Sequence, residues 1–304
     1  MSDSLNQQQI QWFPGHMAKT LRLIGSELKK VDAVLVLLDA RIPASSLNPE
    51  IEALLGTKPR IYLLNKSDLA DPAVTSRWVA RLRSEHSACV AISSKKKGAA
   101  AGVKAEVDRA LAPLLARRAE KGIAGAQIRL MLVGIPNVGK STFINCFAGG
   151  QRAKAEDRPG VTRGKQWVTA GKYDLLDMPG VLWKKFESRT TAINLAFIGS
   201  IKDDILDIEE IAAELLEEVK RLYPEKLAQR YKLRPEQMEL SRYELLEAIG
   251  KNRGMLISGG EIDLTRAATT VLDEFRASKL GAISLESPET AQFPGREEKT
   301  DEQS

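Results

Sequence analysis

Cysteine and histidine are almost missing from this sequence. Among 304 residues there are two cysteines, Cys89 and Cys146, and two histidines, His16 and His86. Neither cysteine has a second cysteine or a histidine at ligand spacing, so the sequence excludes a cysteine-rich zinc module and offers no disulfide framework. We expect both cysteines to be packed in the interior.

Long apolar runs are also absent. No run approaches the roughly 18 residues that are needed to cross a bilayer. The first ten residues, MSDSLNQQQI, have neither the basic start nor the apolar core of a signal peptide. We therefore expect a cytoplasmic protein without a membrane span. With 43% hydrophobic and 28% charged residues, the composition is that of a globular protein, long enough for one α/β domain and a smaller second domain.

Acidic residues are outnumbered by basic ones. The net charge is +5, although residues 286–304 hold six acids against two bases, so the rest of the chain is more basic than this value implies. A basic body is typical of a protein that contacts nucleic acid, but charge runs are also common on solvated surfaces. The candidate contacts to RNA phosphates are Lys19, Arg22, Lys29, Lys30, Lys95, Lys96, Lys97, Arg117 and Arg118.

Hydrophobic periodicity predicts an α/β region in the first two thirds of the chain. Apolar runs of strand length alternate with amphipathic segments, which is typical of a mixed, mostly parallel sheet with helices on both faces. The predicted strands are 31–40, 59–68, 88–97, 128–134 and a strand–turn–strand unit at 166–180, and the predicted helices are 17–30, 74–84, 99–121 and one that begins at residue 140.

The pattern changes after residue 205. Three segments with charged outer faces, 208–224, 242–254 and 263–275, predict helices with no strand between them. We therefore expect four parts, namely a disordered N-terminus over residues 1–11, an α/β domain over 12–204, a small all-α domain over 205–285 and a disordered tail over 286–304.

Residues 134–141, GIPNVGKS, match the pattern G-x-x-x-x-G-K-[ST] of a phosphate-binding loop. The match follows an apolar strand and precedes a helix, as the motif requires. The glycines let backbone N–H groups turn toward phosphate oxygens, Lys140 would neutralise the phosphates, and the Ser141 hydroxyl would ligate Mg²⁺. The predicted nucleotide-binding residues in this loop are Asn137, Val138, Gly139, Lys140, Ser141 and Thr142.

Residues 65–68, NKSD, end another predicted strand and form a short guanine-reading motif. Asp68 can accept hydrogen bonds from N1–H and the exocyclic amine of guanine, which adenine does not offer. The Lys66 stem can cover the base, and Asn65 can tie this loop to the phosphate loop. The alternative is an ordinary turn with Asp68 as a helix cap. Ser93 and Ser94 end the next strand, so the predicted base-side residues are Asn65, Lys66, Ser67, Asp68, Ser93 and Ser94.

Residues 177–180, DMPG, end a further strand. Asp177 can hold Mg²⁺ through a water, and the backbone N–H of Gly180 can bond the γ-phosphate. Thr162, in the stretch RPGVTR, is the predicted second hydroxyl on Mg²⁺, with a turn cap as the alternative.

All five motifs of a GTPase are present, but in a rearranged order. In a Ras-like enzyme the guanine motif follows the phosphate loop, whereas here Asp68 precedes Gly134. The same sheet forms if the old termini are joined and new ones are opened in a surface loop. The sequence therefore predicts a circularly permuted P-loop GTPase domain, in which the segment 99–121 spans the old termini.

This order resembles the ribosome biogenesis GTPase A (YlqF/RbgA) family of circularly permuted GTPases, as do WFPGHMAK at 12–19 and RGMLISGGEIDLTRAATTVLDEFRASKLGAISLE at 253–286. The resemblance covers about residues 10–286. It implies a GTP-hydrolysing factor in late assembly of the large (50S) ribosomal subunit, with GTP, GDP and Mg²⁺ as ligands and rRNA and ribosomal proteins as partners. It also implies docking through the helical domain. Related permuted GTPases that carry zinc sites do not fit a chain with two lone cysteines.

The water-orienting residue of Ras-like enzymes is missing. The glutamine that follows their D-x-x-G motif is Val181 here, and valine cannot direct a water. By the resemblance, His16 is the catalytic group; the alternative is a structural cap in the PGHM turn. His86 lies in a polar stretch and is expected at the surface.

The asparagine at position 137 indicates a binding site for a second ion, K⁺. In GTPases that use K⁺ in place of an arginine finger, an asparagine at this position supplies an ion ligand; the alternative is that Asn137 only braces the loop. Two functions remain open: a GTP-hydrolysing assembly factor, and a nucleotide-gated ribosome-binding module with incidental hydrolysis, which Val181 favours. No oligomer is predicted.

Overall fold

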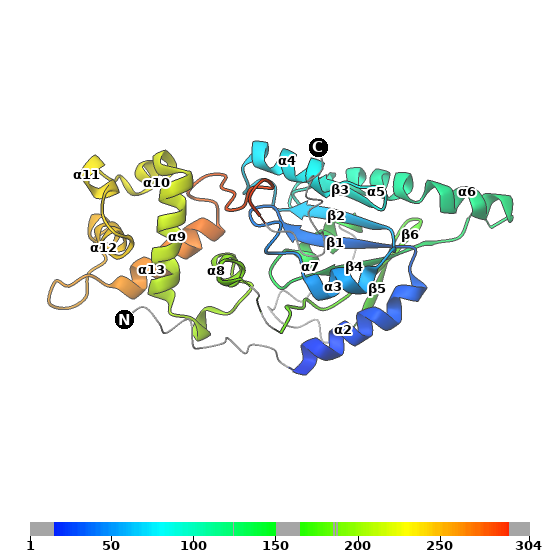
Figure 1. Cartoon of the computed structure of the whole chain (residues 1–304), viewed down its shortest axis with the longest axis horizontal. Coiled ribbons are helices and arrows are strands. Elements are labelled where there is room, and N and C mark those ends of the chain that lie inside the picture. The colour runs from blue at the N-terminus through cyan, green and yellow to red at the C-terminus, as the bar shows by residue number, and fades with distance from the viewer. Residues whose placement is uncertain (1–14, 124, 150–164, 185, 187, 292–304) are drawn as a thin grey trace, which may run out of the picture.

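The computed structural model describes residues 15–291, apart from 124, 150–164, 185 and 187. Figure 1 shows a sheet surrounded by helices, a second group of helices beside it, and helix α8 (Arg189–Phe197) between the two. In the described part of the chain, no helix is both long and apolar enough to cross a membrane. The predicted fold class, an α/β domain followed by helices, is confirmed.

The described residues form one mixed sheet with the strand order β3–β2–β1–β4–β6–β5. All neighbouring pairs are parallel except β5 with β6. Strand β4 lies between β1 and β6 although it comes fourth along the chain, which is the arrangement that the predicted permutation requires. The strands are β1 (Ala33–Asp39), β2 (Arg60–Asn65), β3 (Ser87–Ala91), β4 (Ile128–Gly134), β5 (Gln166–Ala170) and β6 (Tyr173–Asp177).

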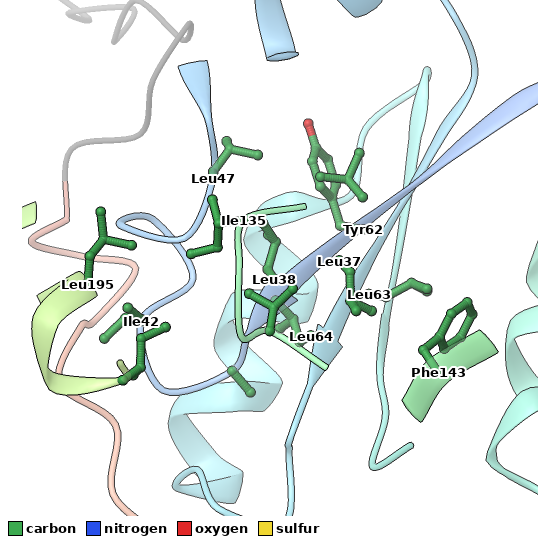
Figure 2. Packing of buried hydrophobic residues seen from close by; sticks show 14 of the residues in the cluster. Leu37, Leu38, Ile42, Leu47, Tyr62, Leu63, Leu64, Ile135, Phe143 and Leu195 are labelled. Carbon is green, nitrogen blue, oxygen red and sulfur yellow. The ribbon is translucent and has the colours of Figure 1, made fainter. Parts of the chain in front are cut away.

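Strand β1 is apolar along its length because both faces of the sheet are covered. All seven of its residues are buried. Figure 2 shows Leu37 and Leu38 among apolar side chains from β2, from the loop after β4 and from helix α7 (Lys140–Phe147). Cys89 is buried as expected, whereas Cys146 is only partly so. This core fixes the strand ends that carry the motifs.

The predicted helix over 99–121 is wrong in one respect, because it is two helices. These are α5 (Ala99–Ala110) and α6 (Ala112–Glu120). Pro113 has no backbone N–H and is accommodated in the first turn of a new helix, so the first helix ends before it. The other helices near the sheet are α2 (Gly15–Glu27), the 3₁₀ helix η1 (Leu28–Lys30), α3 (Pro49–Leu55) and α4 (Pro72–Leu82).

The helices after residue 205 pack on one another and on α8. The rings of Phe197 and Phe275 have centroids 6.5 Å apart, and Arg189 is ion-paired with Glu214. Helix α8 thus packs on the helical region although it precedes residue 205. The elements of this region are η2 (Asp203–Ile205), α9 (Ile208–Leu222), α10 (Pro224–Tyr231), α11 (Pro235–Met238), α12 (Arg242–Asn252) and α13 (Leu264–Arg276).

After α13 the chain returns to the sheet. The N–H of Ile283 donates to the carbonyl of Leu69, and that of Leu285 donates to the carbonyl of Arg41, both at 2.9 Å. Glu286, which the sequence puts at the start of the tail, accepts a hydrogen bond from the N–H of Ala44 at 2.7 Å. The C-terminal end of the helical region is therefore bonded to the α/β region.

Candidate functional site

The last residues of four parallel strands meet at one edge of the sheet. They are Asp39 of β1, Asn65 of β2, Gly134 of β4 and Asp177 of β6. Parallel neighbours place their carboxyl ends side by side, so motifs that are far apart in the chain share one site.

The loop between β4 and α7 packs too closely for side chains at its two motif glycines. A Cβ on Gly134 would lie 2.6 Å from the carbonyl oxygen of Leu37. Gly139 has a φ of 93°, and a Cβ there would lie 2.6 Å from Nδ2 of Asn65. The loop ends at the N-terminus of α7, where free backbone N–H groups favour an anion.

Lys140 and Asp177 are the charged groups beside this loop. The Nζ of Lys140 donates to the carbonyls of Gly134 and Ile135 at 3.2 and 3.0 Å. Burial lowers the pKa of Lys140 to about 8, and burial raises the pKa of Asp177 to about 6, while the attraction between the two charges opposes both shifts. Among the described residues, the buried Oδ1 of Asp177 has no hydrogen-bond partner. An unpaired carboxylate oxygen beside a phosphate loop fits a Mg²⁺-bound water.

Gly180 brings the backbone of the DMPG motif against the phosphate loop. A Cβ on Gly180 would lie 2.7 Å from Nζ of Lys140 and 3.0 Å from the backbone N of Pro136. Ser141 and Thr142, in the first turn of α7, are exposed. Gly180 and Lys140 therefore lie together against the phosphate loop.

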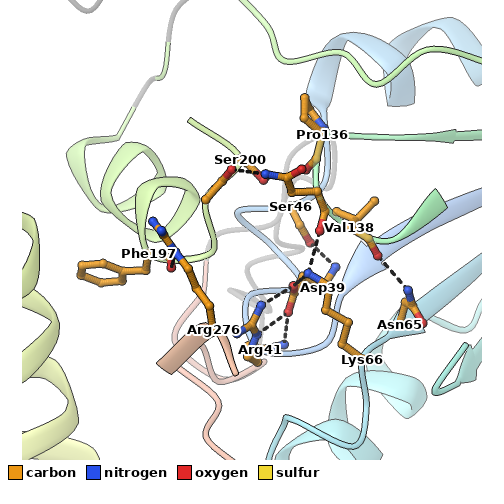
Figure 3. Close-up of polar contacts among 12 residues, drawn as sticks. Asp39, Arg41, Ser46, Asn65, Lys66, Pro136, Val138, Phe197, Ser200 and Arg276 are labelled. Carbon is orange, nitrogen blue, oxygen red and sulfur yellow. Dashed lines mark hydrogen bonds and ion pairs between the residues drawn. The ribbon is translucent and has the colours of Figure 1, made fainter. Parts of the chain in front are cut away.

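Asn65 joins the base loop to its two neighbours. Its Nδ2 donates to the carbonyl of Val138 at 2.7 Å, and its Oδ1 accepts from the N–H and the hydroxyl of Ser94 at 3.1 and 2.7 Å. Figure 3 shows the first of these bonds. The predicted tie between the base loop and the phosphate loop is therefore present, and the strand end at Ser94 is part of it.

Lys66 is held by the backbone carbonyl of Asn137 and the carboxylate of Asp39. Its Nζ donates to the carbonyl of Asn137 at 2.6 Å and lies 3.0 Å from Oδ2 of Asp39. Arg41 pairs with the same carboxylate through Nη2 at 2.8 Å and through Nε at 2.9 Å (Figure 3). Burial opposes ionisation of Asp39, but Arg41 and Lys66 outweigh it and hold the pKa of Asp39 well below its usual range.

Asp39 and Arg41 belong to this site although no sequence motif predicted them. Both side chains are almost fully buried. The signal was a charged residue, Asp39, at the end of a strand that is otherwise apolar, with a residue of opposite charge, Arg41, shortly after it. A buried charge requires such a partner.

Asp68 is exposed at the mouth of the base loop. The cap of α4 is Asp71, which accepts from the N–H groups of Ala73 and Val74 at 2.9 and 3.2 Å. This excludes the alternative in which Asp68 is the cap. Nearby, the N–H of Ser67 donates to the carbonyl of Ile92 at 3.0 Å, next to the buried Ser93.

Val181 is buried, and its backbone is held on both sides. Its N–H donates to the carbonyl of Gly134 at 3.4 Å, and its carbonyl accepts from Nδ2 of Asn48 at 3.0 Å. We call the stretch 177–181, which includes the DMPG motif, the switch segment. The side chain of Val181 is apolar and enclosed, so it packs within this segment and cannot orient a water.

The structure does not describe the side chains of two predicted site residues. His16 lies in the first turn of α2, and its side chain is outside what the structure describes. Thr162 also lies outside the described residues. His86 is exposed, as expected. Within the described part of the chain, no group of three or more His, Cys, Asp or Glu side chains could hold a metal ion.

The chain is similar to GTPases of ribosome assembly. A family model described as "50S ribosome-binding GTPase" matches residues 129–236. Ribosome biogenesis GTPase A of Bacillus cereus is 44% identical over 92% of this chain and 94% of its own length. Mitochondrial ribosome-associated GTPase 1 of Mus musculus is 33% identical over 90% of this chain and 89% of its own. The structure of GNP-bound YlqF from T. maritima is 27% identical, with a TM-score of 0.60 over 89% of this chain and 99% of that one.

Proposed function

Because the chain belongs to the ribosome biogenesis GTPase A family, we propose that it binds a precursor of the large (50S) ribosomal subunit and promotes a late step of its maturation in the cytoplasm. It hydrolyses GTP, and the proposed cycle uses this reaction for release: GTP orders the switch segments, the protein docks, and hydrolysis frees it. The observation that carries this proposal is the clamp at Asn65, because it joins a guanine-reading loop to a phosphate loop.

The proposed Mg²⁺ ligands are Ser141, Thr162 and, through water, Asp177. The exposed hydroxyl of Ser141 and the unpaired Oδ1 of Asp177 support two of these assignments. Mg²⁺ bound there would neutralise charge on the β- and γ-phosphates. Lys140, now bonded to loop carbonyls, would turn to the phosphates when they bind.

K⁺ is the proposed second ion, and Asn137 its protein ligand. The amide Nδ2 of Asn137 donates to the carbonyl of Gly199, so the amide oxygen is the atom left for an ion. GTP turnover should be faster in K⁺ than in Na⁺, and equal rates in the two salts would contradict this assignment.

His16 is the proposed catalytic group. Val181 supports this indirectly, because its enclosed side chain leaves the usual water-orienting position without a polar group. Replacing His16 by Ala should lower subunit-stimulated turnover and leave the affinity for GDP nearly unchanged. Unaltered stimulated turnover would contradict the assignment.

Exposed basic residues are the proposed contacts to rRNA phosphates. Lys19, Arg22 and Lys29 are exposed on and just after α2. Arg118 is a weaker candidate, because its Nη2 is 2.6 Å from Oδ1 of Asp32 and that pairing would have to be given up. The other exposed candidates are Lys30, Lys95, Lys96, Lys97 and Arg117.

A GTPase assay with and without ribosomal subunits tests the proposed function. We expect strong stimulation by 50S or pre-50S subunits and none by 30S subunits at the same concentration. The rival function is a nucleotide-gated binding module with incidental hydrolysis. It predicts GTP-dependent binding to the 50S subunit with an unchanged rate, so binding and turnover measured on the same mixtures separate the two.

A further inference from the structure

The end of helix α13 is bonded to both sides of the nucleotide site, although it belongs to the helical region. On the base side, Nη1 of Arg41 donates to the carbonyl of Phe275 at 3.4 Å, and the Arg41 guanidinium lies 5.0 Å from the centre of the Phe275 ring. Arg41 is the partner of Asp39, which also pairs with Lys66. On the phosphate side, the contacts run through the neighbouring residue, Arg276.

Arg276 fixes the end of α8 and the loop that follows it. Its Nε donates to the carbonyl of Phe197 at 3.0 Å, and its Nη2 donates to that of Ala196 at 2.9 Å. Both terminal nitrogens also bond the carboxylate of Asp203 at 2.6 and 2.7 Å. Gly199, at a φ of 72°, turns the chain here, and a Cβ on it would lie 3.4 Å from the guanidinium. One side chain therefore ties both ends of residues 196–203 together.

The same loop is bonded directly to the phosphate loop. The hydroxyl of Ser200 donates to the carbonyl of Pro136 at 2.8 Å (Figure 3), and the carbonyl of Gly199 accepts from the side-chain amide of Asn137. Ser200 is buried, so the bond to Pro136 is partly shielded from water. Asn137 itself has a φ of 60°, a conformation that needs support from its surroundings.

We propose that Arg276 is a positioning residue for the phosphate loop, which acts through Gly199 and Ser200 on Pro136 and Asn137. This rests on the proposed function only in that the loop binds GTP and GDP. Arg276 touches no phosphate-loop atom itself. Because linkage is reciprocal, nucleotide bound at the loop stabilises the attachment of α13 to the site.

The test is the affinity for GDP of two variants that cut this route at different points. Arg276→Gln removes the guanidinium that bonds Ala196, Phe197 and Asp203. Ser200→Ala removes only the hydrogen bond from Ser200 to the carbonyl of Pro136. Arg276 lines an open cleft of about 520 Å³, so glutamine can be hydrated there without strain. We expect the dissociation constant for a fluorescent GDP to rise about tenfold in Arg276→Gln and about threefold in Ser200→Ala. In the double variant, the dissociation constant should rise by less than the product of the two single increases, because both substitutions act through one loop.

Arg253→Gln is the matched control. Arg253 also lies in the helical region, is similarly exposed and pairs with Glu274, but it is not bonded to residues 196–203 among its described contacts. Its GDP affinity should stay within about twofold of the wild type. Equal losses in Arg276→Gln and Arg253→Gln, or unchanged affinity in Ser200→Ala, would overturn the proposal.

Amide hydrogen exchange detects whether nucleotide binding is coupled to helix α13. A merely structural role of Arg276 would not produce this coupling. Addition of GDP to the wild type should slow amide exchange in residues 264–276, and Ser200→Ala, which keeps the bond between Asn137 and Gly199, should weaken this effect while remaining folded. A wild type that fails to bind GDP would contradict the proposed function. A wild type that binds GDP without protecting α13 would contradict only the role of Arg276.

Discussion

Asn65 shows how much of the site depends on single side chains. Three hydrogen bonds from one amide join the ends of β2 and β3 to the phosphate loop, and a Cβ on Gly139 would collide with this amide. The clamp holds the base loop and the phosphate loop in one geometry. Lys66 follows Asn65 directly, and Asp68 belongs to the same loop.

Asp68→Asn should change which base is bound. An amide in place of the carboxylate can donate a hydrogen bond to the 2-oxo group of xanthine. It can no longer accept from both N1–H and the exocyclic amine of guanine. We expect GTP affinity to fall by at least about tenfold and XTP to become the preferred nucleotide. Competition binding with GTP, XTP and ATP measures this, and an unchanged preference for GTP would remove Asp68 from the base site.

Arg41→Gln should cost stability in a pH-dependent way. The pKa of Asp39 is lower in the folded protein than in the unfolded chain. The ion pair of Asp39 with Arg41 therefore stabilises the fold fully above the unfolded pKa. This stabilisation is lost as the pH falls through the lower, folded pKa. Without Arg41, only Lys66 opposes the effect of burial, so the pKa of Asp39 rises and the variant loses more stability as the pH rises. We expect a loss of about 3 kcal/mol at pH 7.5 and a smaller one at pH 4.5, measured by urea unfolding. Equal losses at both pH values would contradict this. Asp39→Asn added to Arg41→Gln should recover part of the stability.

At the scale of elements, the cap of the short helix α3 is bonded to the switch segment. Its cap, Asn48, accepts from the N–H groups of Glu50 and Ile51 through Oδ1 at 2.9 and 3.2 Å. The Nδ2 of the same side chain donates to the carbonyl of Val181. A seven-residue helix therefore braces the residue next to Gly180, and an asparagine before proline was its sequence signal.

Asn48→Ala should lower both stability and turnover. Loss of the cap costs about 1 kcal/mol, and the released Val181 carbonyl loosens the segment that carries Gly180. We expect intrinsic GTP turnover to fall by about threefold or more. Asp71→Ala is the control, since Asp71 caps α4 in the same manner without a bond to the switch segment. A similar fall in turnover in both variants would show that the effect is one of stability alone.

At the scale of the whole molecule, the chain closes on itself through residues 283–286. Glu286 accepts from the N–H groups of Ala44 and Ser45 and from Nδ2 of Asn194, which is on α8. One carboxylate thus joins the loop after β1, the end of the chain's helical region and α8. This contact and the end of α13 fix the helical region to the GTPase domain.

Glu286→Ala should weaken that attachment. The carboxylate is nearly enclosed by its donors, which would be left without an acceptor, and we expect a loss of about 2 kcal/mol. The thermal unfolding curve should broaden or split as the two regions uncouple. Glu289→Ala, which removes an exposed ion pair with Arg77, should leave the curve nearly unchanged. A single sharp transition in Glu286→Ala would argue against this coupling.

Much of the fold follows from local pattern. The strand at 128–134 was predicted to the residue, and the α/β region and the later helices follow from hydrophobic period. Pro113 shows where the pattern failed, because apolar spacing continued through a residue that breaks the backbone hydrogen bonding.

The sequence by itself determined the motifs, their permuted order and the family, because these depend on residue identity and spacing along the chain. Only the tertiary structure decided that Asp39 pairs with both Arg41 and Lys66 and that Asn48 holds the carbonyl of Val181. It also decided that Arg276 bonds the end of α8, next to the Gly199 that accepts from Asn137. These contacts join elements that are distant in the chain and polar in character. They exist because the packing of the sheet and the two groups of helices leaves buried polar groups that must find partners.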